Sequence, residues 1–260
     1  SNAPHTPLHA KPEDMARYKG TYAEGWEKIR AARFQRQKEL GVIPQDWELP
    51  GLTPGVPAWE DIPEDQHELM ALYMEIYAGL VDNLDQNVGR MIDELDQLGI
   101  LDNTLFIITS DNGASSIGGP DGAANFAEKR VTQQESPELA NQMMAEGRMG
   151  AVDTAPAYPT GWANAGNTPF RFYKRTPMNG GIRVPFIAHW PARIADAGMV
   201  RDQWMHVTDV LPTLLDILGA QYPEQFGGYR TRSMDGTSFR EALFDADAEK
   251  CRETQHYELE

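Results

Sequence analysis

The amino-acid sequence predicts an α/β protein, in which helices cover a β-sheet. Three observations support this: an amphipathic stretch over residues 65–98, an apolar run without alternation over residues 105–109, and a second such run over residues 184–190 that precedes a capped helix. Strands without polar–apolar alternation are expected where both faces of a strand are covered. The order helix, strand, loop, strand, helix is typical of an α/β sheet.

The chain before the amphipathic stretch divides into a helical part and an irregular part. Aromatic and apolar residues spaced by threes and fours predict a helix over residues 12–40 that ends at Gly41. Prolines and glycines recur between Val42 and Pro63, and this composition predicts an irregular crossing of the surface.

Residues 65–98 are predicted to form one long helix, with Gly99 at its C-terminal cap. The apolar residues hold to one stripe, which predicts a face packed in the core rather than a cofactor site. The stripe contains Leu69, Leu72, Tyr73, Ile76, Tyr77, Leu80, Leu84, Val88, Met91, Ile92 and Leu95.

Fewer elements are predicted after the first strand. Residues 113–168 are rich in Gly, Ala, Ser and Asn, with one short helix expected near residues 138–146. The helix "VLPTLLDILG" begins after Thr208 or Asp209 and ends at Gly219, with its proline in the first turn, where the missing N–H costs nothing. His206 and Asp209 flank this start, so capping is their expected role.

Composition and charge exclude several classes of protein. A hydrophobic share of 41% and a charged share of 24% are ordinary for a soluble globular domain, and no apolar run is long enough to span a membrane. The net charge of −16 argues against nucleic acid or an anionic membrane as a partner. The single cysteine, Cys251, excludes an internal disulfide and a multi-cysteine metal site.

The basic residues are distributed unevenly. From Thr154 to Ala195 there is no Asp or Glu, although the whole chain has 39. A stretch without carboxylates in an acidic protein indicates a surface that accepts an anion, and a buried, loop-rich segment explains it equally well. Its cationic residues are Arg171, Lys174, Arg175, Arg183 and Arg193.

Asp111-Asn112-Gly113 follows the first predicted strand directly. Asn-Gly is a strong hairpin signal, but "ASSIGGPDGAAN" offers no returning strand. Functional residues of α/β proteins gather at the carboxyl ends of strands, and a carboxylate beside an amide carbonyl supplies two oxygen ligands of the kind that Ca²⁺ or Mg²⁺ prefers. The further ligands of such a site must come from elsewhere.

His5 and Lys174 are ambiguous on their own. A histidine between prolines near a chain end is usually solvated, and a lysine is usually a surface residue. Lys174 gains interest from the acid-free stretch and from Gly180-Gly181, which let the backbone approach a ligand closely.

Taken together, these segments resemble the sulfatase family of the alkaline phosphatase superfamily, and particularly bacterial arylsulfatases. The resemblance rests on "PHTPLHAKPEDMARYKGTYAEGWE", "DNTLFIITSDNGAS", "WANAGNTPFRFYKRTPMNGGIRVPFIAHWP", "DVLPTLLDILG" and "MDGTSF", in the family's order. It implies an alkaline-phosphatase-like mixed, mostly parallel sheet flanked by helices, incomplete in this chain. It also implies a sulfuric ester hydrolase that acts on a small-molecule sulfate ester.

The resemblance implies a role for each candidate residue. Asp111 and Asn112 match the family's metal-binding pair, which helps to hold Ca²⁺ or Mg²⁺ against the sulfate. His5 matches a histidine that contacts the sulfate and the bridging oxygen, and Lys174 matches a lysine in the same place. The cation and the ammonium would neutralise charge on the sulfuryl group, and a protonated imidazole would act as general acid.

The sequence departs from the family at the nucleophile. The family's Cys-x-Pro-x-Arg stretch, whose cysteine or serine becomes formylglycine, is absent, and the family's aspartate pair, lysine and histidine that would lie upstream of His5 are absent as well. We therefore expect residues 4–260 to be the C-terminal portion of a sulfatase catalytic domain without its N-terminal half and a small C-terminal segment, and Ser1-Asn2-Ala3 to be a tag remnant. Such a fragment is expected to be inactive alone and to self-associate through exposed sheet edges.

Two other functions remain open at this stage. One is a phosphoesterase or phosphonate monoester hydrolase of the same superfamily, because similar groups hold tetrahedral anions of phosphorus and sulfur. The other is a non-catalytic binding module with the sulfatase fold.

Overall fold

The computed structural model describes residues 4–132 and 136–259, so the predicted tag remnant at residues 1–3 lies outside the described residues. The chain forms two compact units. The first unit comprises the residues up to Leu95 together with Thr109–Pro185, and the second unit comprises Asp96–Ile108 and Phe186–Glu258.

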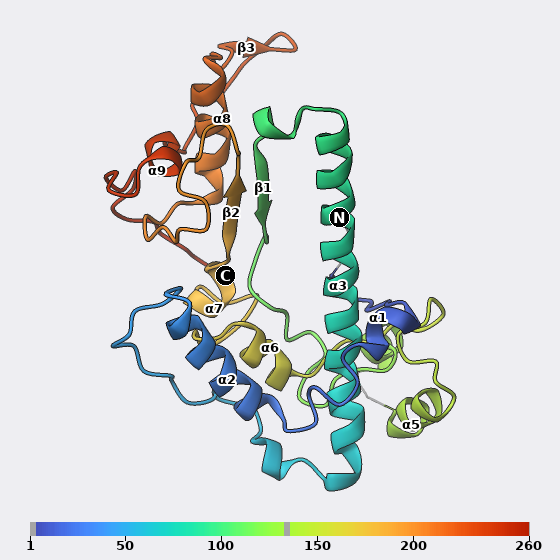
Figure 1. Cartoon of the computed structure of the whole chain (residues 1–260). Helices are drawn as coiled ribbons and strands as arrows, with labels where there is room; N and C mark the ends of the chain where they lie inside the picture. The colour runs from blue at the N-terminus through green and yellow to red at the C-terminus, as the bar shows by residue number, and fades with distance from the viewer. Residues whose placement is uncertain (1–3, 133–135, 260) are drawn as a thin grey trace. The chain divides into compact units, whose positions relative to one another are not determined.

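The first unit is mainly helical (Figure 1). Its elements are α1 (Pro12–Ala16), α2 (Trp26–Glu39), the 3₁₀ turns η1 (Trp59–Asp61) and η2 (Glu64–Gln66), α3 (His67–Gln97, whose last two residues fall in the second unit), α4 (Phe126–Thr132), α5 (Pro137–Ala145), α6 (Thr160–Gly166) and α7 (Asn179–Ile182). The irregular crossing before α3, the long helix itself and the short helix near residues 138–146 are confirmed. The helices α4, α6 and α7 were not predicted from the sequence.

The helix predicted over residues 12–40 is wrong as a single element, because turns separate α1 from α2. Gly20 and Gly25 adopt φ angles of 79° and 87°, in the left-handed region that an α-helix cannot continue through. A Cβ at Gly25 would lie 2.3 Å from the ring of Trp59. The glycine is therefore needed both for the turn and for the packing of that indole.

Two indoles form the centre of the first unit's core. Trp26 of α2 and Trp162 of α6 are almost completely buried and meet edge to face, with ring centroids 5.7 Å apart. The Nε1 of Trp26 donates to the carbonyl of Pro57 at 3.0 Å, and the Nε1 of Trp162 donates to the carbonyl of Met70 at 2.7 Å. Each buried N–H thus has a partner, and these bonds fix the irregular crossing and α3 to the core.

The apolar stripe of α3 is buried along only part of its length. Its buried residues run from Leu69 to Leu80, whereas Met91 is 56% exposed and the stripe's more C-terminal residues are half-buried at most. The prediction that the whole stripe is core is wrong for this second half. The stripe is longer than the core that the described residues build around it.

The second unit contains the strands. Its elements are η3 (Leu101–Asn103), β1 (Phe106–Thr109, whose last residue belongs to the first unit), β2 (Phe186–His189), η4 (Val207–Asp209), α8 (Val210–Leu218), β3 (Gln225–Phe226), β4 (Tyr229–Arg230) and α9 (Arg240–Phe244). β1 pairs with β2, and β3 pairs with β4 in an antiparallel hairpin.

The strands differ from the prediction in burial and in sheet type. Ile108 of β1 is 38% exposed and Ile187 of β2 is 54% exposed, so the expectation that both faces are covered is wrong in the described residues. Within residues 4–132 and 136–259 the sheets have two short strands each, and the expected mostly parallel sheet is not present.

The expected capping role of His206 and Asp209 is confirmed at η4, the turn directly before α8, whereas Asp209 stands at the N-cap position of α8 without a side-chain cap bond to that helix. The backbone amide of His206 donates to Oδ2 of Asp209 at 2.8 Å, and the ring of His206 accepts from the amide of Thr208. Gly219 ends the helix with φ 61°. In the part of the chain that the structure describes, none of the helices is apolar over a length that would cross a bilayer.

Candidate active site

The Asp111–Asn112 pair is not a hairpin turn. The next residue, Gly113, donates its backbone N–H to the carbonyl of Gly181 at 2.9 Å, so the chain runs on into a contact with a segment far away in the sequence. A Cβ on Gly113 would lie 1.8 Å from the carbonyl oxygen of Gly180. Only glycine allows this approach of two backbones.

The side chains of this pair keep oxygen atoms accessible. Asp111 is exposed and Asn112 is half-buried. The Nδ2 of Asn112 donates to the carbonyl of Gly113 at 2.9 Å, and this bond directs the amide nitrogen to the backbone. Among the described residues, no hydrogen bond or ion pair engages the Asp111 carboxylate, which therefore remains available as a ligand.

Lys174 lies on the backbone segment next to this pair. Its amide donates to the carbonyl of Ala114 at 2.9 Å, two residues beyond Asn112. The flanking residues Phe172 and Arg175 adopt φ angles of 64° and 72°, which are uncommon for residues with side chains. A backbone bent on both sides of Lys174 is held in place by its surroundings, as is typical of functional loops.

Asn167, at the end of α6, holds the two segments together. Its Oδ1 accepts from the amide of Ala114 at 2.8 Å, and its Nδ2 donates to the carbonyl of Phe172 at 3.0 Å. The amide of Phe172 in turn donates to the buried hydroxyl of Thr53 at 2.8 Å, which also accepts from Asn164 at 3.0 Å. The sequence analysis did not single out these residues.

The tyrosine beneath this segment adds a further polar contact. The hydroxyl of Tyr158 accepts a hydrogen bond from the amide of Ser115 at 3.2 Å. Burial raises the pKa of Tyr158, so the phenol is neutral at physiological pH and adds no negative charge near the Asp111–Asn112 pair.

His5 is not joined to the other candidate residues by any contact within the described residues. Its ring is exposed, and its Nδ1 lies 2.6 Å from the carbonyl of Thr6. The chain just after it is fixed to another segment, where Leu8 donates to Pro156 at 3.0 Å and Ala10 donates to Gly150 at 3.1 Å. The structure thus brings the Asp111–Asn112 segment and the Lys174 loop together and leaves the role of His5 a prediction.

The sulfatase family model matches residues 1–220. The chain belongs to the sulfatase family. It is 34% identical over 223 residues to an uncharacterized sulfatase of Schizosaccharomyces pombe, a match that covers 85% of this chain and 38% of the relative. It is 32% identical over 219 residues to an arylsulfatase of Klebsiella aerogenes, covering 84% of this chain and 44% of the relative. The chain thus spans less than half the length of each.

Among solved structures, the sulfatase-family chain is similar to Ps i-CgsB, with a TM-score of 0.46 and 22% identity. That match covers 94% of this chain and 32% of the other. The resemblance that the sequence analysis stated is confirmed by the family model.

The donor set of this sulfatase-family chain does not complete a metal site by itself. Within residues 4–132 and 136–259, no three His, Cys, Asp or Glu residues cluster where they could hold a metal ion. Asp111 and Asn112 offer oxygen ligands, whereas calcium takes about six to eight. The pair fits a calcium site only in part.

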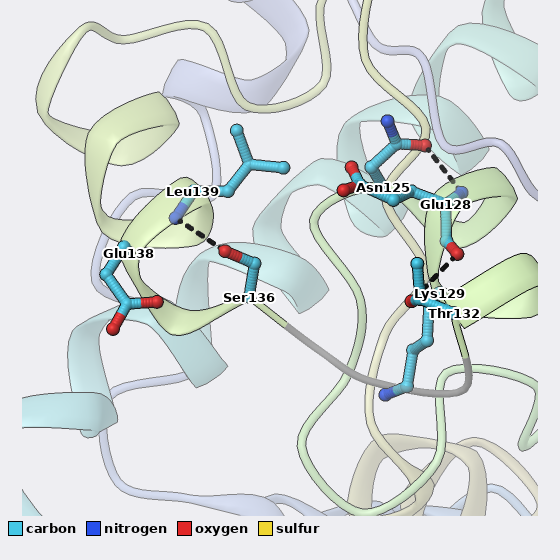
Figure 2. Close-up of a pocket in the computed structure, with 7 residues that line it drawn as sticks. All are labelled: Asn125, Glu128, Lys129, Thr132, Ser136, Glu138 and Leu139. Atoms are coloured by element: carbon cyan, nitrogen blue, oxygen red, sulfur yellow. Dashed lines mark hydrogen bonds between the residues drawn. The ribbon is translucent and has the colours of Figure 1, made fainter.

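The first unit contains a cavity whose lining includes none of the candidate residues (Figure 2). It has a volume of about 270 Å³ and is lined by Asn125, Glu128, Lys129, Thr132, Ser136, Glu138 and Leu139. Ser136 accepts from the amide of Leu139 at 3.3 Å, and Asn125 accepts from the amide of Glu128 at 3.3 Å. These polar groups cap helix starts, so the cavity shows no separate chemistry.

Proposed function

We propose that this chain is part of a sulfatase that hydrolyses a small-molecule sulfate ester, with Asp111, Asn112, Lys174 and His5 in its oxyanion site. Membership of the sulfatase family supports the reaction type. The observation that favours this site is the 2.9 Å backbone bond between Lys174 and Ala114, because it joins the backbone of Lys174 to the segment next to the predicted metal pair.

Each residue has a defined task in this proposal. Asp111 and Asn112 contribute oxygen ligands to Ca²⁺ or Mg²⁺, together with ligands from outside this chain, and the cation lowers the cost of negative charge on the sulfate. Lys174 pairs with a sulfate oxygen. His5 gives a proton to the leaving oxygen. The formylglycine nucleophile belongs to sequence outside this chain, so residues 4–260 alone are expected to be inactive.

The test uses the parent protein, expressed from the reading frame that includes the sequence upstream of His5. We expect a Cys-x-Pro-x-Arg or Ser-x-Pro-x-Arg stretch there, and faster hydrolysis of an aryl sulfate than of the matching aryl phosphate. Lys174→Ala should lower kcat/KM for the sulfate about a hundredfold to a thousandfold. Lys28→Ala is the matched control, because that exposed lysine of α2 pairs with Glu24 on the surface.

Other outcomes select the other functions. A preference for the phosphate would indicate a phosphoesterase or phosphonate monoester hydrolase. An upstream frame with no nucleophile stretch, and no hydrolysis of either ester, would indicate a binding module. Full activity of Lys174→Ala would remove this lysine from the site.

Calcium titration tests the metal pair in the chain as it stands. With only two predicted ligand residues, we expect calcium to bind weakly or not at all in a calorimetric titration of residues 1–260. A submicromolar dissociation constant would mean that this chain completes the site alone. In the parent protein, Asp111→Asn should weaken the metal dependence of hydrolysis more than Asp121→Asn does.

A further inference from the structure

An arginine of the acid-free stretch contacts two aromatic rings in the first unit. The guanidinium of Arg183 lies 5.9 Å from the ring centroid of Trp47 and 5.1 Å from that of Phe170. The two rings meet edge to face at 6.1 Å. Trp47 comes from the irregular crossing and is half-buried, as is Phe170, while Arg183 is exposed. The three side chains therefore form one partly open surface.

Two more arginines lie on or contact the segment that contains Phe170. Arg171 is exposed, and its guanidinium lies 5.7 Å from the ring of Phe172. Arg30, only 3% exposed, donates to the carbonyls of Pro50 and Pro169. Burial lowers the pKa of Arg30, and the nearby positive charge of Arg171 lowers it further.

These cations lack acidic partners. Within the described parts of the chain, none of the ion pairs includes Arg30, Arg171 or Arg183, although acids outnumber bases. Bringing cations together without counter-charges costs free energy, and a bound anion removes that cost. An anionic ligand would therefore offset the repulsion between Arg30 and Arg171 and would pair with the exposed Arg183.

The arrangement of Arg183 suits a particular kind of ligand. A guanidinium stacked on rings keeps the N–H groups at its edge directed outward, where they bind a sulfate or carboxylate through two parallel hydrogen bonds. The exposed parts of the aromatic rings offer an apolar face to a cyclic molecule. A ring that bears an anionic group matches both features.

The same loop belongs to the candidate active site. Lys174, Gly180 and Gly181 lie between Phe170 and Arg183, and Gly181 accepts from Gly113 at 2.9 Å. The amide of Arg183 donates to the carbonyl of Asn179 at 2.8 Å, which fixes it at the end of α7. If Lys174 holds one anionic group of a substrate, the other groups of that substrate would lie near the same segment, residues 170–183.

We propose that Trp47, Phe170, Arg171 and Arg183 form a subsite for a second anionic group, so that the substrate is a cyclic, sugar-like sulfate ester with two anionic substituents. This inference rests on the proposed function for the substrate's reacting sulfate. The recognition of the second anion is independent of hydrolysis and is tested by binding alone.

The experiment measures binding of three probes to residues 1–260 by calorimetry at fixed ionic strength. The probes are one hexose with a single sulfate, the same hexose with two sulfates, and the same hexose with one sulfate and one carboxylate. We expect both dianionic probes to bind about tenfold more tightly or better, because a bidentate guanidinium contact adds to the first anion site. Comparing the two dianionic probes shows which anion the subsite prefers.

Variants separate a subsite from a structural role. Arg183→Gln should remove the preference for dianionic probes, and Arg183→Lys should restore part of it. Trp47→Ala should weaken every probe. The matched control is Arg193→Gln, because Arg193 also contacts two rings, Trp190 at 5.3 Å and Phe244 at 5.7 Å, in the second unit.

Three results would overturn the proposal. The first is equal affinity for the single-sulfate probe and the dianionic probes. The second is an equal effect of Arg183→Gln and Arg193→Gln on the preference for dianionic probes. The third is an Arg183→Gln variant that unfolds at a lower midpoint and still prefers the dianionic probes. Failure of the proposed function looks different: the parent protein would not cleave a sulfate ester, while the preference for two anions and its loss in Arg183→Gln would persist.

Discussion

The side-chain oxygen of Asn167 accepts the backbone amide of Ala114 at 2.8 Å, while its amide nitrogen holds the carbonyl of Phe172 at 3.0 Å. One side chain from the end of α6 therefore joins the segment after Asp111–Asn112 to the loop that contains Lys174. Removing it should affect both segments at once.

Asn167→Ala is expected to destabilise the first unit by about 1–3 kcal/mol, because it leaves polar backbone groups without partners. At the site itself, we expect faster hydrogen exchange of the backbone amide of Ala114. Asn167→Asp should protect that amide and still loosen Phe172, since a carboxylate accepts but cannot donate. Asn87→Ala, on an exposed part of α3, is the control, and equal exchange rates in both alanine variants would contradict the prediction.

Gly113→Ala should destabilise the chain by about 3 kcal/mol, because the new Cβ would lie 1.8 Å from a backbone oxygen that cannot move alone. Gly89→Ala in the middle of α3 meets no atom within 4 Å. It should stabilise the chain by about 0.5–1 kcal/mol through helix propensity. Urea unfolding followed by circular dichroism compares the two, and a change of the same sign for both would be unexpected.

The second unit should lose stability in acid through Asp209. Burial favours the protonated form of this carboxyl, but hydrogen bonds from Arg252 and from the amides of His206 and Thr237 outweigh it, so the pKa of Asp209 is lowered. A carboxyl whose pKa is lower in the folded chain than in the unfolded chain stabilises the fold above its unfolded pKa, which is about 4 for Asp. This stabilisation is lost as the pH falls through the lower pKa of the folded state.

Urea midpoints measured from pH 6 to pH 3 in Asp209→Asn should therefore show a weaker acid dependence than those of the unchanged chain. Arg252→Gln should cost about 3 kcal/mol at pH 6, because it leaves the fully buried carboxylate without its cation. If the urea midpoint of Asp209→Asn fell with pH as steeply as that of the unchanged chain, other carboxylates would be responsible for the loss of stability in acid.

Self-association is expected because apolar side chains and strand edges are exposed. Met91 and Leu98 are 56% and 61% exposed, and exposed apolar side chains favour contact with another molecule. Light scattering should show a dimer or larger species. Met91→Lys with Leu98→Lys should shift it toward the monomer, and the exposed polar Gln97→Lys should not. A monomer at all concentrations would oppose this.

The sequence predicted the elements that depend on local signals. α3 and α5 depend on the periodicity of apolar residues, and the turn η4 before α8 depends on the capping residues His206 and Asp209, so all three can be read from neighbouring residues. The division of residues 12–40 was missed because Gly20 and Gly25 act against an otherwise good helical spacing, and Trp59, far along the chain, requires the glycine. The burial of the strands was predicted wrongly, because a run without alternation shows only that the residues are apolar. It does not show which elements cover the strand.

The candidate site was predictable only as residue types. Motifs singled out Asp111, Asn112 and Lys174, and backbone hydrogen bonds join their segments, while a shared site of their side chains stays a prediction. Asn167 and Thr53 were missed, because a residue whose side chain joins two distant backbone segments has no spacing rule to reveal it. The position of His5 relative to these residues stays a prediction.

The chain passes between its two units at Leu95–Asp96, at Ile108–Thr109 and again at Pro185–Phe186. A single protease nick near Pro185 would therefore not free Phe186–Glu258, because β2 remains paired with β1, which is still tied at both ends to the N-terminal piece. The nicked halves should migrate together on a native gel and separate only in detergent.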